Sequence, residues 1–182
     1  DEIGGDYYDF LEFKRDGGQH LGVMLGDVTG HGVAAAMLMA TARSLLRTHA
    51  PTCLSVAEMM TRVNEQLAGD VSGGRFMTLF FMHLDISARS ACWSSAGHDP
   101  AIKHNPGQKS FEDLGGEDPP FGIDPGRRFH QRGPVILQSG EVLTLATDGV
   151  WESRNKEGER FGKDRLREVI RAHSERSAAE IA

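Results

Sequence analysis

The segments of this chain that favour strands come in neighbouring pairs, with helical segments in blocks between the pairs. Residues 6–13 and 21–28 are two largely apolar runs, joined by a polar stretch that contains Gly17 and Gly18. A short glycine-containing connection favours antiparallel pairing of the strands on either side. We therefore expect the chain to open with a β-hairpin.

Two more pairs follow. Residues 76–84 form a long apolar run that predicts a central strand, paired with residues 91–95 across a short turn. Residues 135–138 and 142–147 predict a third hairpin around Ser139-Gly140. Because strands and helices do not alternate as they do in βαβ chains, the order predicts an α+β fold in which helices cover antiparallel sheets.

The helical segments carry recognisable start signals. Residues 33–40 are apolar on every side of a helical projection, which predicts a helix buried all round. A second helix is expected to begin at Ser55, because Ser55 and Glu58 have the spacing of a capping box. Ser177 and Glu180 repeat that spacing, so another helix should start close to the end of the sequence.

Length and composition describe one ordinary globular domain. The 182 residues can bury a substantial core, and we expect a single domain over residues 1–182 that continues beyond both ends. A net charge of −6 argues against a nucleic-acid surface. No apolar run approaches the ~20 residues that span a bilayer. Cys53 and Cys92 form no metal or disulfide motif, which favours a cytoplasmic location.

Asp27 is the first candidate for chemistry. It is expected at the end of a strand, before a glycine-rich turn (Gly30-His31-Gly32) and the start of a helix. A carboxylate there could ligate a hard metal ion, and a helix N-terminus favours anions such as phosphate. The ordinary alternative is an Asx turn that caps the helix. Both interpretations remain open at this point.

Two further aspartates lie in similar settings. Asp148 follows an apolar strand and precedes Gly149, an arrangement that also marks plain turns. Asp6 follows Gly4-Gly5 at the start of a strand, where glycines allow close backbone approach or simply form a bulge. If strand ends gather at one rim of a sheet, these side chains could act together.

Other motifs give weaker evidence for a functional site. Residues 158–164 resemble a P-loop only superficially, because the spacing is one residue short and Asp164 replaces Ser or Thr. The histidines lack zinc-site spacing, and no Gly-x-Ser-x-Gly elbow supports a serine nucleophile. His31 and His98 lie in glycine-containing loops, where support of a neighbouring site is more plausible than metal ligation.

Four motifs together resemble a known family. In order along the chain they are GGDYYDF (4–10), GDVTGHGVAA (26–35), AGHDP (96–100) and TDGVWE (147–152). This series resembles the RsbU/SpoIIE branch of the metal-dependent protein phosphatases (PPM, protein phosphatase 2C-like). The resemblance implies an α-β-β-α sandwich of two packed antiparallel sheets flanked by helices, with a C-terminal strand missing from this sequence.

The resemblance also implies a site. Two Mn²⁺ or Mg²⁺ ions would be bridged by Asp27, with Asp6 and the carbonyl of Val28 on one ion and Asp148 on the other. A hydroxide bridging the ions would attack phosphorus in line. The family's last ligand belongs to an Asp-Asp-x-Thr segment that this sequence does not reach.

The substrate implied by the family is a phosphoserine or phosphothreonine on an anti-sigma-factor antagonist, a STAS-domain protein. An N-terminal sensor or receiver domain is expected in the parent chain, with no nucleic-acid partner and no membrane contact by this domain. Two rival hypotheses remain: a non-catalytic partner-binding module of the same fold, and a structural site with a single metal ion.

Overall fold

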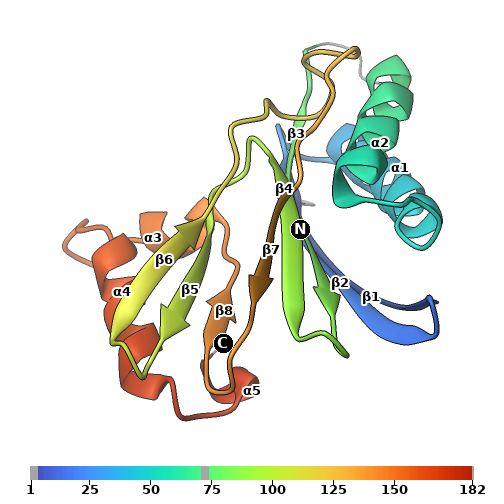
Figure 1. The fold of residues 1–182 in the computed structure, drawn as a ribbon. Coiled ribbons are helices and arrows are strands. Elements are labelled where there is room, and N and C mark those ends of the chain that lie inside the picture. The colour runs from blue at the N-terminus through green and yellow to red at the C-terminus, as the bar shows by residue number, and fades with distance from the viewer. Residues whose placement is uncertain (1–3, 71–73, 182) are drawn as a thin grey trace. The chain divides into compact units, whose positions relative to one another are not determined.

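The computed structural model describes residues 4–70 and 74–181, and its ribbon is drawn in Figure 1. The chain divides into two compact units. Unit 1 comprises the chain up to His98 together with residues 116–136, and unit 2 comprises residues 99–115 and the chain from Leu137 on. No helix in the described ranges is both long enough and apolar enough to cross a bilayer.

Unit 1 contains a five-stranded antiparallel sheet in the order β1-β2-β3-β4-β7. Its strands are β1 (Asp6–Arg15), β2 (Gly18–Val28), β3 (Met77–Asp85), β4 (Ser90–Ala96) and β7 (Arg132–Ile136). The first two predicted hairpins are therefore confirmed. The β1–β2 turn is tighter than expected, because only Asp16 and Gly17 separate the paired residues Arg15 and Gly18. Both turn residues have positive φ (50° and 79°), as a two-residue hairpin turn matched to strand twist requires.

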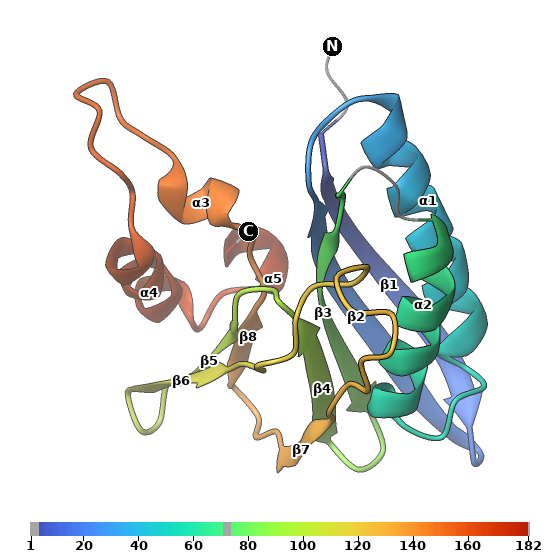
Figure 2. The same cartoon turned by 90° about the horizontal axis from the view of Figure 1, so that it is seen from above.

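Two helices, α1 (Val33–His49) and α2 (Val56–Asp70), lie side by side on one face of this sheet, as the view from above shows (Figure 2). Leu46 and Leu67 of the helices are fully buried in one cluster with Met24 and Leu79 of the strands. The expected cap is present, since the Ser55 hydroxyl accepts a hydrogen bond from the Glu58 backbone N–H (3.1 Å).

The prediction that residues 33–40 form a helix buried all round is wrong. Val33 is 70% exposed and Met37 is 66% exposed, whereas Ala35 and Leu38 are buried. Small apolar residues on every side made this helix look internal, but only one side of it contacts the sheet. An all-apolar pattern does not by itself distinguish a buried helix from one whose second face is exposed.

Unit 2 is smaller. Its antiparallel sheet has the order β6-β5-β8, formed by β5 (Ala101–Asn105), β6 (Ser110–Leu114) and β8 (Val142–Thr144). The helices are α3 (Asp148–Glu152), α4 (Lys163–His173) and α5 (Ala178–Ile181), the last of which begins at the predicted Ser177 signal. Ile102, Leu166 and Ile170 form its buried core. The two antiparallel sheets with their helices confirm the predicted α+β class.

The third predicted hairpin is wrong, because β7 pairs with β4 in one sheet and β8 pairs with β5 in the other. The contacts around Glu141 give the reason. Its carboxylate accepts a hydrogen bond from the Asn105 side chain (2.9 Å) and lies 3.8 Å from the Lys103 ammonium group, so the start of β8 is fastened to β5. The sequence placed strands close to these positions, although β7 covers residues 132–136 and β8 ends at Thr144, but it could not predict their partners.

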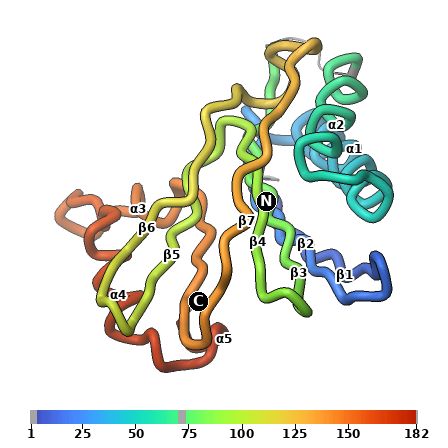
Figure 3. Tube along the Cα trace, in the orientation of Figure 1, coloured from blue at the N-terminus to red at the C-terminus, as the bar shows by residue number. Residues whose placement is uncertain are grey.

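The connection between β6 and β7 passes beside α2 and can be followed in gold in Figure 3. Within unit 1 the fully buried Asn64 side chain of α2 donates to the carbonyl of Asp124 (2.8 Å) and accepts from the Gly122 N–H (3.1 Å). The Thr61 hydroxyl of α2 accepts from the Phe129 N–H (3.0 Å). Side chains of α2 thus satisfy backbone groups that the loop cannot pair with itself.

Candidate metal centre

Asp6 and Asp27 lie directly opposite each other at the end of the β1–β2 hairpin. The Val28 N–H donates to the Gly5 carbonyl (3.1 Å), so the adjacent Asp6–Asp27 pair is of the non-hydrogen-bonded type. In such a pair both side chains point to the same face, with Cβ atoms ~4.5–5.5 Å apart. Like charges in this position destabilise a sheet, and a divalent cation between them would remove that repulsion.

Gly5 leaves room for oxygen atoms to converge beside this pair. A Cβ atom at Gly5 would lie 2.3 Å from the Val28 carbonyl oxygen and 2.6 Å from Asp27 Oδ1. Both oxygens therefore point toward the space where any other residue would carry its side chain. A backbone carbonyl and carboxylates are the donors that Mg²⁺ and Mn²⁺ prefer. The residues of unit 1 thus fit a hard divalent cation.

The chain beyond Val28 leaves the sheet in a defined way. The Thr29 N–H donates to the Phe76 carbonyl (3.0 Å), and the Thr29 hydroxyl accepts from the Phe76 N–H (2.9 Å), which closes the β2–β3 ladder. Helix α1 then starts after Gly32, and no side chain caps it by a hydrogen bond. Asp27 is therefore not the N-cap residue of α1, which is Gly32.

Two residues beside Asp27 form a support that the sequence only partly indicated. Thr78 is the partner of Asp27 on β3, and its hydroxyl lies 3.4 Å from the Asp27 carbonyl oxygen and 2.9 Å from His98 Nδ1. His98 thus lies next to Thr78, and its supporting role stays a prediction. Thr78 was missed, because residues 76–84 were paired only with the strand that follows them. His31 lies exposed in the turn between Gly30 and Gly32.

Asp148 belongs to unit 2. The strand before it ends at Thr144 instead of Thr147, and Asp148 is an exposed residue in the first turn of α3. An acidic residue is favourable there because it faces the positive end of the helix dipole. Within residues 4–70 and 74–181, no three acidic, histidine or cysteine side chains gather closely enough to hold a metal ion.

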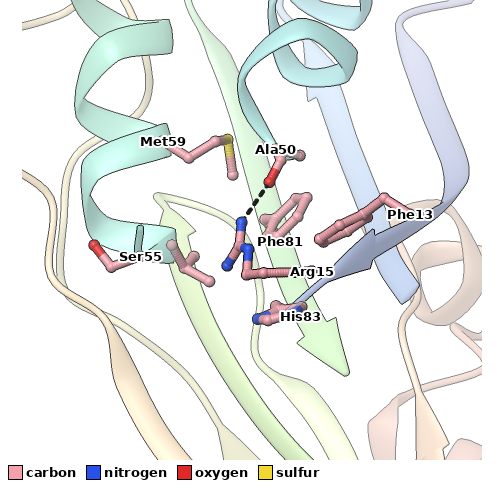
Figure 4. A pocket seen from close by; sticks show the side chains of 8 residues that line it. Phe13, Arg15, Ala50, Ser55, Met59, Phe81 and His83 are labelled. Carbon is pink, nitrogen blue, oxygen red and sulfur yellow. Dashed lines mark hydrogen bonds between the residues drawn. The ribbon is translucent and has the colours of Figure 1, made fainter. Parts of the chain in front are cut away.

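A second feature of unit 1 lies where β1 and β3 meet the connection between α1 and α2 (Figure 4). The Arg15 guanidinium donates to the carbonyls of Ala50 (2.9 Å) and Cys53 (2.6 Å) at the end of α1. Burial, assisted by the charge of Arg15, lowers the pKa of His83 to about 4. The cavity here measures about 10 Å³, which is room for one water molecule and too small for a substrate. The hydrogen bonds of Arg15 therefore serve to attach β1 to the chain after α1.

Comparison with known proteins identifies the family. The family described as Stage II sporulation protein E (SpoIIE) matches residues 17–182. The chain belongs to the SpoIIE family. This confirms the predicted resemblance to the RsbU/SpoIIE branch of the metal-dependent phosphatases.

Individual relatives agree with this family. Phosphoserine phosphatase RsbU of Bacillus subtilis (strain 168) is 26% identical over 183 residues, which cover 99% of this chain and 52% of RsbU. The chain thus spans about half the length of that relative. The RsbU and RsbW domains of Rv1364c from Mycobacterium tuberculosis match with a TM-score of 0.78 and 25% identity, over 94% of this chain and 47% of theirs.

A more distant structure shows the same fold. RsbX in complex with magnesium matches with a TM-score of 0.69 at 16% identity, over 99% of this chain and 81% of RsbX. The SpoIIE-family chain, with its two antiparallel sheets and few helices, therefore has the fold of protein phosphatase 2C-like structures.

Proposed function

We propose that this SpoIIE-family chain is a metal-dependent protein serine/threonine phosphatase. The observation that carries the proposal is that the Asp27 carboxylate and the Val28 carbonyl converge on the space that Gly5 leaves open, with Asp6 directly opposite Asp27 on β1. Membership of the SpoIIE family and the likeness to a named phosphoserine phosphatase support it.

The proposed ligand set is that of the family motifs. Asp27 would bridge two Mn²⁺ or Mg²⁺ ions, Asp6 and the Val28 carbonyl would complete one ion, and Asp148 would hold the other. When bound, such ions lower the pKa of a water molecule and offset charge on phosphoryl oxygens. The magnesium complex of RsbX supports the choice of metal. The assignment of Asp148 rests on its motif and not on its geometry.

The protein's own residues set the geometry of the reaction. The paired strands β1 and β2 fix the spacing of the two carboxylates, and Gly5 keeps a side chain out of the space beside the Asp27 carboxylate and the Val28 carbonyl. Held on rigid strands, the ligands need little rearrangement as the reaction proceeds, which is the condition under which electrostatic stabilisation is most effective.

The proposed substrate is a phosphoserine or phosphothreonine on an anti-sigma-factor antagonist of the STAS type. The proposed partner within the parent chain is an N-terminal sensor or receiver domain, and the proposed location is the cytoplasm. The likeness to RsbU, of which this chain covers only about half, supports a larger regulatory protein.

The test is release of phosphate from a phosphoserine protein by the full-length enzyme with Mn²⁺. We expect Asp6→Asn and Asp27→Asn each to reduce kcat by more than the ~10–100-fold that a supporting residue costs. Glu12→Gln is the matched control, since Glu12 is an exposed acidic residue on the same face of β1. Stable binding of the phosphoprotein without phosphate release by the wild type would instead establish the non-catalytic module.

A further inference from the structure

A row of side chains crosses three strands at the candidate metal centre. Asp6 on β1 lies opposite Asp27 on β2, and Asp27 lies opposite Thr78 on β3. Cross-strand partners point to the same face of a sheet, so Thr78 is the neighbour of Asp27 on the side away from Asp6. Thr78 is therefore close enough to Asp27 to hydrogen-bond to it.

The Thr78 hydroxyl stands between the Asp27 backbone and an imidazole. Its oxygen is 2.9 Å from His98 Nδ1 and 3.4 Å from the Asp27 carbonyl oxygen. A hydroxyl has one proton to donate and can accept as well. When Nδ1–H of His98 donates to the hydroxyl, the Thr78 proton is directed to the Asp27 carbonyl. That carbonyl belongs to the peptide that joins Asp27 to Val28, the two residues proposed to supply ligands.

The backbone of His98 is in turn anchored by Ser95. The Ser95 hydroxyl accepts from the His98 N–H (3.2 Å) and donates to the His98 carbonyl (2.9 Å). The preceding residue, Gly97, has a φ of 64°, and a Cβ there would lie 2.5 Å from the Pro120 side chain. Only glycine fits this position without displacing Pro120.

The loop that contacts Gly97 is fastened by a buried carboxylate. The Asp118 carbonyl accepts from the Gly97 N–H (2.8 Å), and the Asp118 side chain is only 4% exposed. That carboxylate accepts from the Arg127 guanidinium (2.6 Å) and from the backbone N–H of His130 (2.9 Å). These donors hold the pKa of Asp118 below its usual range although burial acts to raise it. The support behind His98 is therefore a connected network of hydrogen bonds.

We propose that Thr78 and His98 are positioning residues, which fix the Asp27–Val28 peptide in the orientation that metal binding requires. This inference rests on the proposed phosphatase function. Neither residue is assigned a contact with substrate. Hydrogen bonds that orient metal ligands from behind commonly contribute a 10–100-fold effect on metal affinity, without changing the ligands themselves.

The experiment removes the hydroxyl and restores it. Thr78→Val keeps the branched shape that suits a strand but cannot donate, whereas Thr78→Ser keeps the hydroxyl and loses only a methyl group. In the full-length protein we expect Thr78→Val to weaken Mn²⁺ binding about 10–100-fold by isothermal titration calorimetry. The kcat for a phosphoserine protein should fall while KM stays unchanged. Thr78→Ser should recover both.

Variants of His98 test the second contact independently. His98→Ala should match Thr78→Val in Mn²⁺ affinity, and His98→Asn, whose amide can reach the position of Nδ1, should recover part of the loss. If the two residues act as one chain of hydrogen bonds, Thr78→Val/His98→Ala should bind Mn²⁺ no more weakly than either single variant. If the losses of Mn²⁺ affinity in the two single variants add up in the double variant, Thr78 and His98 do not act through one chain of hydrogen bonds. Should the Thr78→Val substitution disturb the sheet, the His98 variants decide alone, because they leave β3 unchanged.

The outcomes separate this inference from the proposed function. A wild type that binds Mn²⁺ and releases phosphate, with Thr78→Val and His98→Ala binding Mn²⁺ equally well, would overturn the positioning role and leave the phosphatase intact. A wild type that neither binds Mn²⁺ nor releases phosphate would remove the proposed function itself. Thermal unfolding followed by circular dichroism checks that each variant is folded.

Discussion

Gly5 is the residue whose replacement most directly tests the candidate metal centre. A methyl group there would lie 2.3 Å from the Val28 carbonyl oxygen and 2.6 Å from Asp27 Oδ1, distances at which one of the groups must move. We expect Gly5→Ala to lower Mn²⁺ affinity and kcat by about tenfold or more, the size of effect that misplaced ligands produce. Calorimetric titration with Mn²⁺ measures the first and phosphate release the second.

The neighbouring glycine gives a matched control for this substitution. A Cβ at Gly4 would have no heavy atom within 4 Å, so Gly4→Ala changes the same dipeptide without filling the site. Gly4→Ala should behave as the wild type. Equal Mn²⁺ affinities for the two alanine variants would mean that the space beside Asp27 is not where a cation binds.

At the scale of elements, α1 is attached to β1 through Asp9. The Arg47 guanidinium donates two hydrogen bonds to the Asp9 carboxylate (2.7 and 2.8 Å), and the Tyr7 hydroxyl donates a third (3.1 Å). The bonds from Arg47 hold the pKa of Asp9 below its usual range. The pair thus connects the helix to the strand that carries Asp6.

We expect Asp9→Asn to lower the free energy of unfolding at pH 7 by roughly 1–2 kcal/mol, a discounted value for charged hydrogen bonds that are partly exposed. Because the folded-state pKa of Asp9 is lowered, its contribution is present above the ordinary Asp pKa of ~3.9 and is lost as pH falls below it. Urea unfolding at pH 7 and near pH 3 should therefore show the variant approaching the wild type in acid. Asp16→Asn in the exposed turn is the control, and an equal loss there would refute the attachment.

The strands of the first two hairpins were predictable from the sequence, whereas β5 and β6 were not, and strand partners were only partly predictable. Residues 6–13 and 21–28 were expected to pair because a short glycine-containing connection joins them, although the two-residue turn that sets their register was not predicted. Residues 135–138 and 142–147 satisfied the same pattern, and yet the strands that overlap them, β7 and β8, belong to different sheets. The Glu141 carboxylate accepts from the neighbouring Gln138 N–H and also from the Asn105 side chain of β5, a contact that no local pattern indicates. Local patterns encode period and turn chemistry, whereas pairing over longer distances depends on side chains remote in sequence.

For the molecule as a whole, the motifs predicted the family, and the structure places two of the three aspartates opposite each other. Asp6 and Asp27 face each other in register, as their motifs require if both are ligands. The contribution of Thr78 could not be read from the sequence, because it depends on β2 lying beside β3 across the intervening helices. The proposed role of Asp148 as a metal ligand rests on its sequence motif alone, because within unit 2 the structure shows only that Asp148 lies in the first turn of α3.

The proposed ligand set makes a prediction about metal stoichiometry in the whole protein. Asp27 is proposed to bridge two ions and Asp148 to hold only one, so Asp27→Asn should lose both ions and Asp148→Asn should lose one. Ions that bind only the folded chain also stabilise it by mass action, by ~2.7 kcal/mol at a free concentration 100 times Kd. The Mn²⁺-dependent rise in Tm should therefore vanish in Asp27→Asn and be reduced in Asp148→Asn.

The control is Asp164→Asn, which replaces an exposed aspartate in the first turn of α4. This variant should keep the full rise in Tm and should retain two bound ions by elemental analysis. If Asp148→Asn also retained two ions, the motif-based assignment would fail while the Asp6–Asp27 site could still stand, because only the latter rests on geometry.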